Sequence, residues 1–313
     1  MRKINRVIFV LLTVILFISP LFMKTTQIVS QANLIEEEDY FKIFSGHYYN
    51  LIIPKANGPE MIFEIDDLYN VDLRLNYLSE YDSPTIYLNS LNYLSGKGYA
   101  LNEIQWNIYG LSETDRTYVN FSRDHLDRDT SFDFSAVIAS ENETYNNYEI
   151  TGLKDTYLQM NINNWTYSSE MRGLALNIIA ESSELDDYER IGPYADSNTQ
   201  EFVVELFYGS YMFEMRFRQI IDLIKTNGDK IGVFSNVYAN FNVQIKDNNP
   251  ADFWISIPYV EDIKQIVLGF DCSINIINTE PITLNYIILT IIGLSVLSFS
   301  TRIIIKKYVR KIK

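Results

Sequence analysis

Apolar and polar residues alternate along much of the middle of the chain. Every second residue is apolar in segments 156–163 and 213–218, and the longest such run covers 233–246. A period of two is typical of a strand with one buried face. Further strands are predicted at 48–53, 60–65, 85–88, 103–109, 118–122, 131–139, 148–151, 174–180, 202–207, 253–257 and 266–276.

One pair of predicted strands carries a turn signal between them. Asn227 and Gly228 separate segment 220–226 from segment 230–237. An Asn-Gly pair between two such runs favours a hairpin with a type I′ turn, because both turn positions need a positive φ. The alternative is a helix over 219–225 that ends near Gly228.

The many short strands, without long helices between them, predict a mostly β fold. We expect an antiparallel β-sandwich, either one enlarged sandwich or two in tandem. The tandem arrangement divides the chain into a first domain at 46–154 and a second at 155–277. The acidic run at 36–39 makes 33–45 a predicted linker.

The N-terminal segment 1–32 has the layout of a secretory signal peptide. Four basic residues and no acidic one fall in the first 24 positions, and an apolar run covers 7–22. That run is shorter than the roughly 20 residues that cross a bilayer, so cleavage is favoured over an uncleaved N-terminal anchor. Ser30 and Ala32 offer a cleavage site.

The C-terminal segment predicts a transmembrane helix. Residues 282–301 contain no charged side chain, and 20 residues at about 1.5 Å each span about 30 Å, the hydrocarbon thickness. The tail 302–313 carries six basic residues and no acidic one. The positive-inside rule places this tail in the cytoplasm and the middle of the chain outside the cell. Span and tail together are expected to contact membrane lipid.

The middle of the chain is more acidic than the net charge of the whole chain indicates, because both ends are basic. The chain has 40 acidic and 26 basic residues. The first 24 residues hold four of the basic groups and the tail holds six, which leaves 16 against all 40 acidic ones, a formal charge of −24. This balance argues against nucleic-acid binding. One cysteine and two histidines exclude an internal disulfide framework and the common zinc patterns.

Four aspartates within ten residues are the candidate metal ligands. Asp124, Asp127, Asp129 and Asp133 supply the carboxylate oxygens that calcium prefers, in a segment expected to be a loop between two strands. The segment lacks the central glycine and the closing glutamate of an EF-hand, so an ordinary solvated loop is the alternative. No cofactor other than calcium is expected.

Three tryptophans are candidate stacking residues. Trp106, Trp165 and Trp254 lie in strand-like segments. Such residues fill the space between two sheets or, as the alternative, form an exposed platform that stacks a sugar or anchors a partner.

Asn120, Asn142 and Asn164 begin glycosylation triplets, although their number is close to chance expectation. Cys272 lies on the apolar side of a predicted strand, so an inert buried thiol is expected.

The Gly-x-Ser-x-Gly elbow, the phosphate-binding loop and the dinucleotide-binding fingerprint do not occur in the sequence. We therefore expect a single-pass cell-surface protein in a binding, adhesion or envelope-structural role, with an extracellular protein or glycan as its partner. One alternative is an accessory or sensor subunit whose membrane helix pairs through Gly293, Ser295 and Ser298. The other is a surface hydrolase that uses carboxylates.

Overall fold

The structure is a computed structural model that describes residues 31–46, 48–66, 69–82, 88, 90–127, 129–145, 148–169, 172–182, 189–208, 210–239 and 251–277. The apolar run at 7–22, the transmembrane segment 282–301, the basic tail 302–313 and most of the predicted strand 85–88 lie outside these residues. In the described ranges, no helix has the length and apolar character needed to cross a membrane.

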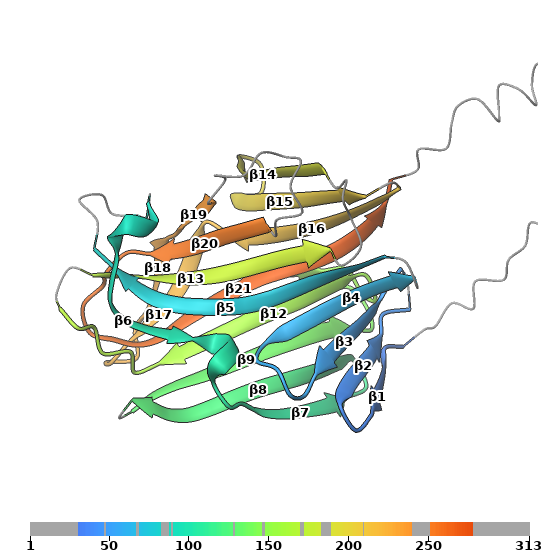
Figure 1. Cartoon of the computed structure of the whole chain (residues 1–313), viewed down its shortest axis with the longest axis horizontal. Coiled ribbons are helices and arrows are strands. Elements are labelled where there is room, and N and C mark those ends of the chain that lie inside the picture. The colour runs from blue at the N-terminus through green and yellow to red at the C-terminus, as the bar shows by residue number, and fades with distance from the viewer. Residues whose placement is uncertain are drawn as a thin grey trace, which may run out of the picture.

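The described residues form two large antiparallel sheets that pack face to face, which confirms the predicted mostly β sandwich (Figure 1). Sheet 1 has the order β1-β2-β3-β4-β5-β13-β20-β19, and β6 also pairs with β5. Its strands are β1 (Asn33–Glu36), β2 (Tyr40–Phe44), β3 (Asn50–Pro54), β4 (Glu60–Asp66), β5 (Tyr69–Tyr81), β6 (Leu94–Ala100), β13 (Gly173–Ser182), β19 (Asn236–Ala239) and β20 (Ala251–Ile257).

Sheet 2 has the order β14-β15-β16-β21-β12-β9-β8-β7, and β17 pairs with both β21 and β18. Its strands are β7 (Asn107–Ser112), β8 (Arg116–Asp127), β9 (Thr130–Ala139), β12 (Asp155–Asn163), β14 (Glu189–Asp196), β15 (Glu201–Tyr208), β16 (Tyr211–Arg218), β17 (Ile220–Lys225), β18 (Lys230–Phe234) and β21 (Ile263–Ile276). A separate hairpin joins β10 (Glu143–Tyr145) to β11 (Tyr148–Ile150), and the 3-10 helices are η1 (Leu91–Tyr93) and η2 (Leu101–Glu103).

The core lies between the two sheets, where the apolar residues of each alternating strand meet. Phe63 of β4 and Phe213 of β16 join the sheets with ring centroids 5.0 Å apart. Phe217 of β16 and Phe253 of β20 do the same at 5.5 Å. Because successive side chains of a strand point to opposite faces, the polar residues between these aromatics lie on the outer faces of the sandwich.

The division into tandem domains at residue 154 is wrong. In sheet 1, β13 lies between β5 and β20, and in sheet 2, β12 lies between β9 and β21. Each sheet therefore draws strands from both sides of residue 154, so the strand pairing is that of one enlarged sandwich. A period of two shows which residues share a face, but it does not show which strand is the neighbour.

The predicted linker 33–45 is also wrong, because it contains β1 and β2, which pair with each other. Phe41 and Ile43 alternate with polar neighbours and are fully or almost fully buried. The acidic run at 36–39 lies at the turn between the two strands. Ala32 is buried as well, and its carbonyl oxygen accepts a hydrogen bond from Thr117 Oγ1 at 3.2 Å.

The hairpin at Asn227 and Gly228 is confirmed, but its turn differs from the prediction. Gly228 has a φ of 92°, whereas Asn227 is not among the residues with positive φ. The Gly228 amide donates to the carbonyl of Lys225 at 2.9 Å, and the Lys225 amide donates to the carbonyl of Asp229 at 2.9 Å. This is a three-residue loop, a type I turn followed by a left-handed glycine.

The predicted long strand 233–246 is interrupted at Ser235. Its first part ends β18 in sheet 2, and the chain then crosses to β19 in sheet 1. The Ser235 amide donates to the carbonyl of Gln219 at 2.7 Å at this crossing. Residues 240–250 lie outside the described ranges.

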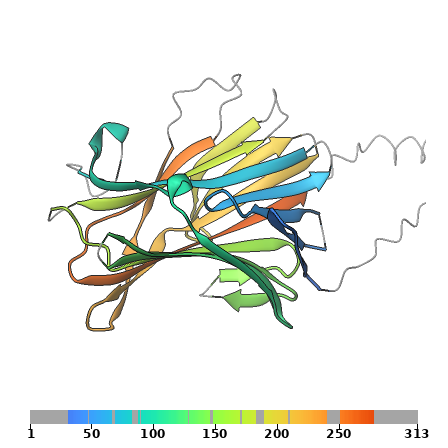
Figure 2. The same ribbon diagram turned by 60° about the horizontal axis from the view of Figure 1, so that its bottom comes forward.

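The start of β1 and the end of β21 lie at the same end of the sandwich (Figures 1 and 2). Strand β21 runs toward this end and finishes there at Ile276. Strand β12 is antiparallel to it, so Asn163 lies at the opposite end. We call these the terminal end and the distal end.

Candidate ligand-binding site

A row of hydrogen-bonded polar side chains covers the outer face of sheet 2 toward the distal end. Alternate residues of β9, β12 and β21 form it because their neighbours in sequence point into the core. We call this set the amide face; it comprises Ser131, Asp133, Gln159, Asn161, Asn163 and Gln265, all of them half-buried.

Hydrogen bonds along and between the strands order the amide face. Gln159 Nε2 donates to Asn161 Oδ1 at 3.0 Å. Gln265 Nε2 donates to Asn163 Oδ1 at 2.9 Å, and Asn163 Nδ2 donates to Asp133 Oδ2 and to Ser131 Oγ, each at 3.1 Å. These bonds leave Asn161 Nδ2 and Gln265 Oε1 without a partner among the described residues. The face thus offers a fixed donor and a fixed acceptor to a ligand.

The β10–β11 hairpin packs on the outer side of sheet 2 and ends the amide face toward the terminal end (Figure 2). The rings of Tyr145 and Tyr148 lie 5.1 and 5.0 Å from that of Tyr157, centroid to centroid. Gly269 of β21 makes this packing possible, since a Cβ atom there would lie 2.3 Å from Tyr157 Oη. Tyr148 Oη donates to the carbonyl of Gly269. The hairpin therefore forms a tyrosine wall beside the sheet.

A pocket of about 180 Å³ lies beside Tyr148 and Tyr157. Tyr148, Tyr157, Arg218 and Gly269 line it together with residues of β17 and Val267. The Arg218 guanidinium lies 4.2 Å from the centroid of the Tyr148 ring. Burial raises the pKa of Tyr148 well above its usual value, so its hydroxyl stays a neutral donor. Tyr157 connects the pocket to the amide face, because its hydroxyl bonds Gln159 Oε1 at 3.2 Å.

Carboxylates of sheet 2 gather around Arg216. Its Nε atom lies 2.9 Å from Glu214 Oε1 and 3.3 Å from Asp271 Oδ2. Burial raises the pKa of Asp271 to about 7, the positive charge of Arg216 opposes this shift, and Asp155 adds to it. Asp155 and Asp271 are almost fully buried. A substrate cannot reach such carboxylates directly, so this cluster gives no support to a hydrolase.

A comparable cluster lies on the outer face of sheet 1. Arg74 pairs with Glu181 at 2.6 Å, Asp72 at 3.2 Å and Glu60 at 3.7 Å. Burial, followed by the charge of Glu60, raises the pKa of Asp72. A pocket of about 250 Å³ lies beside it, lined by Asn57, Glu60 and Arg74 among others. The Arg74 guanidinium beside this pocket pairs with three carboxylates, whereas the Arg218 guanidinium pairs with no described carboxylate.

The predicted calcium ligands lie along a long β8–β9 hairpin. Asp124 is exposed on β8 and Asp129 is exposed beside the turn, whereas Asp133 belongs to the amide face. Burial raises the pKa of Asp133, Asn163 opposes the shift, and Asp124 adds to it. The side chain of Asp127 is outside the described set. Among the side chains that are described, no three of His, Cys, Asp or Glu gather to hold a metal. Calcium binding therefore stays a prediction.

The three tryptophans are buried, so their use as exposed stacking platforms is wrong. Trp106, Trp165 and Trp254 are 8%, 5% and 6% exposed. The rings of Trp106 and Trp165 both stack on the ring of Phe132, with centroids 6.2 and 6.4 Å from its centroid. Trp106 and Trp165 belong to the core cluster between the sheets, whereas Trp254 lies in a separate cluster with Tyr81, Leu88 and Ala175.

The glycosylation candidates occupy three different places. Asn120 Nδ2 donates to Tyr109 Oη at 2.9 Å, and Asn164 Nδ2 donates to the carbonyl of Asp129 at 3.3 Å. Asn142 Oδ1 accepts from the Gly152 amide at 2.9 Å at an exposed turn. Glycosylation stays a prediction.

Cys272 is fully buried, as expected, and burial raises its pKa well above the usual value. Tyr148, Arg218 and Gly269 come from three separate strands, so alternation along any one strand does not indicate that they meet.

Comparison with known protein families and with curated proteins finds no match. Solved structures give distant likenesses. A heparan sulfate lyase HepC mutant from Pedobacter heparinus has 7% identity and a TM-score of 0.41 over 79% of this chain, which spans 36% of that protein. A galactose 1-epimerase from Lactobacillus acidophilus NCFM has 8% identity and a TM-score of 0.42, over 79% of this chain and 99% of the other. A GalM/aldose epimerase homologue from C. elegans has 9% identity and a TM-score of 0.34, over 79% and 100%. At these scores the likenesses carry no inference about ligand or activity.

Proposed function

We propose that this chain is a membrane-anchored extracellular binding protein that takes a glycan on the amide face. The observation that carries the proposal is the ordered row of amide side chains. Hydrogen bonds fix Asn161 and Gln265, while Asn161 Nδ2 and Gln265 Oε1 have no partner among the described residues and can bond a ligand. Sugar hydroxyls both donate and accept hydrogen bonds, so fixed amide groups suit them. Pre-ordering reduces the entropy that binding costs.

The position of the site is consistent with an anchor at 282–301. Gln265 precedes Ile276 by 11 residues on β21, which is about 37 Å of strand. A membrane segment that follows the terminal end leaves the amide face on the side away from the bilayer. Protease shaving of intact cells, with mass spectrometry of the mature N-terminus, tests this orientation. Protection of residues 40–275 from the protease would contradict it.

Binding is tested with the full-length chain in detergent on a panel of neutral and acidic oligosaccharides. We expect at least one glycan to bind, and we expect the double variant Asn161→Ala, Gln265→Ala to weaken that binding at least tenfold. Asn102→Ala is the matched control, because it removes an exposed amide on the sheet 1 side. Equal binding by the double variant and the control would refute the assignment of the site.

A further inference from the structure

Arg218 differs from most of the described arginines of the sandwich, because no described carboxylate pairs with it; Arg123 shares this feature but does not line the pocket. Arg74, Arg116, Arg172 and Arg216 each pair with at least one carboxylate. Arg218 has no ion pair with any described carboxylate, and its Nε atom is buried without a hydrogen-bond partner. The unpaired guanidinium lies in a protein whose middle region is strongly acidic.

The pocket holds this guanidinium in place. The Arg218 Cζ atom lies over the Tyr148 ring, 4.2 Å from its centroid, and Tyr148 is itself fixed by its hydrogen bond to the Gly269 carbonyl. A guanidinium that contacts a ring through Cζ can still donate its N–H groups. Two parallel N–H groups of an arginine match the two oxygens of a carboxylate or sulfate. The one acid that lines the pocket, Asp222, is paired with Lys230 at 2.9 Å.

The pocket also has the right size and position. Its volume of about 180 Å³ equals that of about six water molecules, enough for an anionic group but small for a whole ligand. Gly269 at the pocket and Gln265 on the amide face are four residues apart on β21, or about 13 Å. A ligand that reaches both must extend along the strand.

We propose that Arg218 and its pocket form an anion subsite, and that the ligand of the amide face is an acidic oligosaccharide whose carboxylate or sulfate group binds there. This inference rests on the proposed function, because the amide face supplies the remaining contacts. The net negative charge of the chain disfavours non-specific anion binding, so a bound anion reports on a specific site.

Matched pairs of oligosaccharides test the inference: each sulfated or carboxylated probe is compared with its desulfated or carboxyl-reduced form on the full-length chain. A charge-assisted hydrogen bond contributes about 1.5–3 kcal/mol, so we expect the acidic form to bind about tenfold to 150-fold more tightly. Arg218→Gln should reduce this ratio to about twofold while binding of the neutral form persists.

Two further variants complete the test. Arg218→Lys keeps the positive charge but loses the two parallel N–H donors of the guanidinium. The ratio of acidic-probe to neutral-probe affinity should therefore fall severalfold, with less disturbance of the packing than Arg218→Gln causes. Arg123→Gln is the matched control, because Arg123 also lacks an ion pair with the described carboxylates and sits on β8, and it should leave the ratio unchanged. Equal binding of acidic and neutral probes overturns the anion subsite and leaves the glycan proposal standing. Binding of no glycan overturns both.

Discussion

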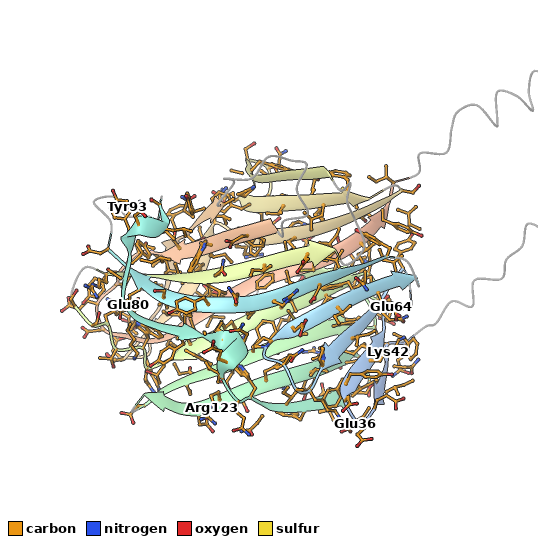
Figure 3. All side chains as sticks on the ribbon, viewed as in Figure 1. Glu36, Lys42, Glu64, Glu80, Tyr93 and Arg123 are labelled. Carbon is orange, nitrogen blue, oxygen red and sulfur yellow. The ribbon has the colours of Figure 1, made fainter. Side chains whose placement is uncertain are left out.

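Glu80 provides a direct test of how the distal end of sheet 1 is held together. Its side chain is fully buried near the end of β5, at the end of the molecule opposite Lys42 and Glu64 (Figure 3). Its carboxylate accepts from the Ser168 amide at 2.8 Å, the Lys97 amide at 3.2 Å and Trp165 Nε1 at 3.3 Å. Ser168 Oγ donates to it as well, and Arg172 Nη1 lies 3.5 Å from Glu80 Oε2.

Glu80→Gln replaces one of these acceptor oxygens with an amide nitrogen that faces donors. Each carboxylate oxygen accepts two of the four hydrogen bonds, so the variant loses two of them. Hydrogen bonds to a charged group contribute about 1.5–3 kcal/mol each, and removal of one partner from a buried pair costs about 3–5 kcal/mol. We expect the free energy of unfolding to fall by about 3–5 kcal/mol.

Urea unfolding followed by tryptophan fluorescence measures this loss, because Trp165 contacts the carboxylate. Glu36→Gln is the control: Glu36 pairs with Lys55 at 3.0 Å, but its side chain is 68% exposed, so the change should be below about 1 kcal/mol. A loss below about 1 kcal/mol for Glu80→Gln as well would show that the buried carboxylate does not hold β6, Trp165 and Ser168 against β5.

Three further predictions concern the core and one turn. The pKa of Asp271 is raised to about 7, so between about pH 4 and pH 7 the folded state keeps a proton that the unfolded chain has lost. The free energy of unfolding should therefore fall by a few kcal/mol as the pH rises from about 4 to about 7. Melting curves of Asp271→Asn should depend less on pH, and an unchanged pH dependence would contradict the assignment. Cys272 should resist a maleimide at pH 8 until the chain is unfolded, and rapid native labelling would exclude its burial. Gly228→Ala should cost about 1 kcal/mol in chemical unfolding, because the residue has positive φ but open space around it, while no loss would argue against the left-handed turn position.

Alternation predicted individual strands well where one face is buried. The pattern predicts the segments that form β12, β16, β17 and β21, because their apolar residues meet the opposite sheet. Strand β5 is absent from the predicted strands, although Tyr69, Val71, Leu73 and Leu75 alternate with polar neighbours. In β2 the same signal covers only Phe41 and Ile43 and follows a run of acids, whose charge suggested a linker.

The pairing of strands could not be predicted, because alternation describes one strand at a time. β5 pairs with β13, about one hundred residues later, and this contact decides that the fold is one sandwich. The site depends on the same long-range pairing. The sequence placed Arg218 on a polar strand face, but only the packing of β11 and β21 beside β16 brings Tyr148 and Gly269 to it.

The amide face is the central claim, and hydrogen–deuterium exchange of the full-length chain with and without its bound oligosaccharide tests it most directly. Protection on binding should be confined to peptides that cover 131–135, 148–163 and 265–269, with 216–222 included for an acidic probe. Protection confined to sheet 1, around Glu60 and Arg74, would contradict the account and move the binding surface to the opposite side of the sandwich.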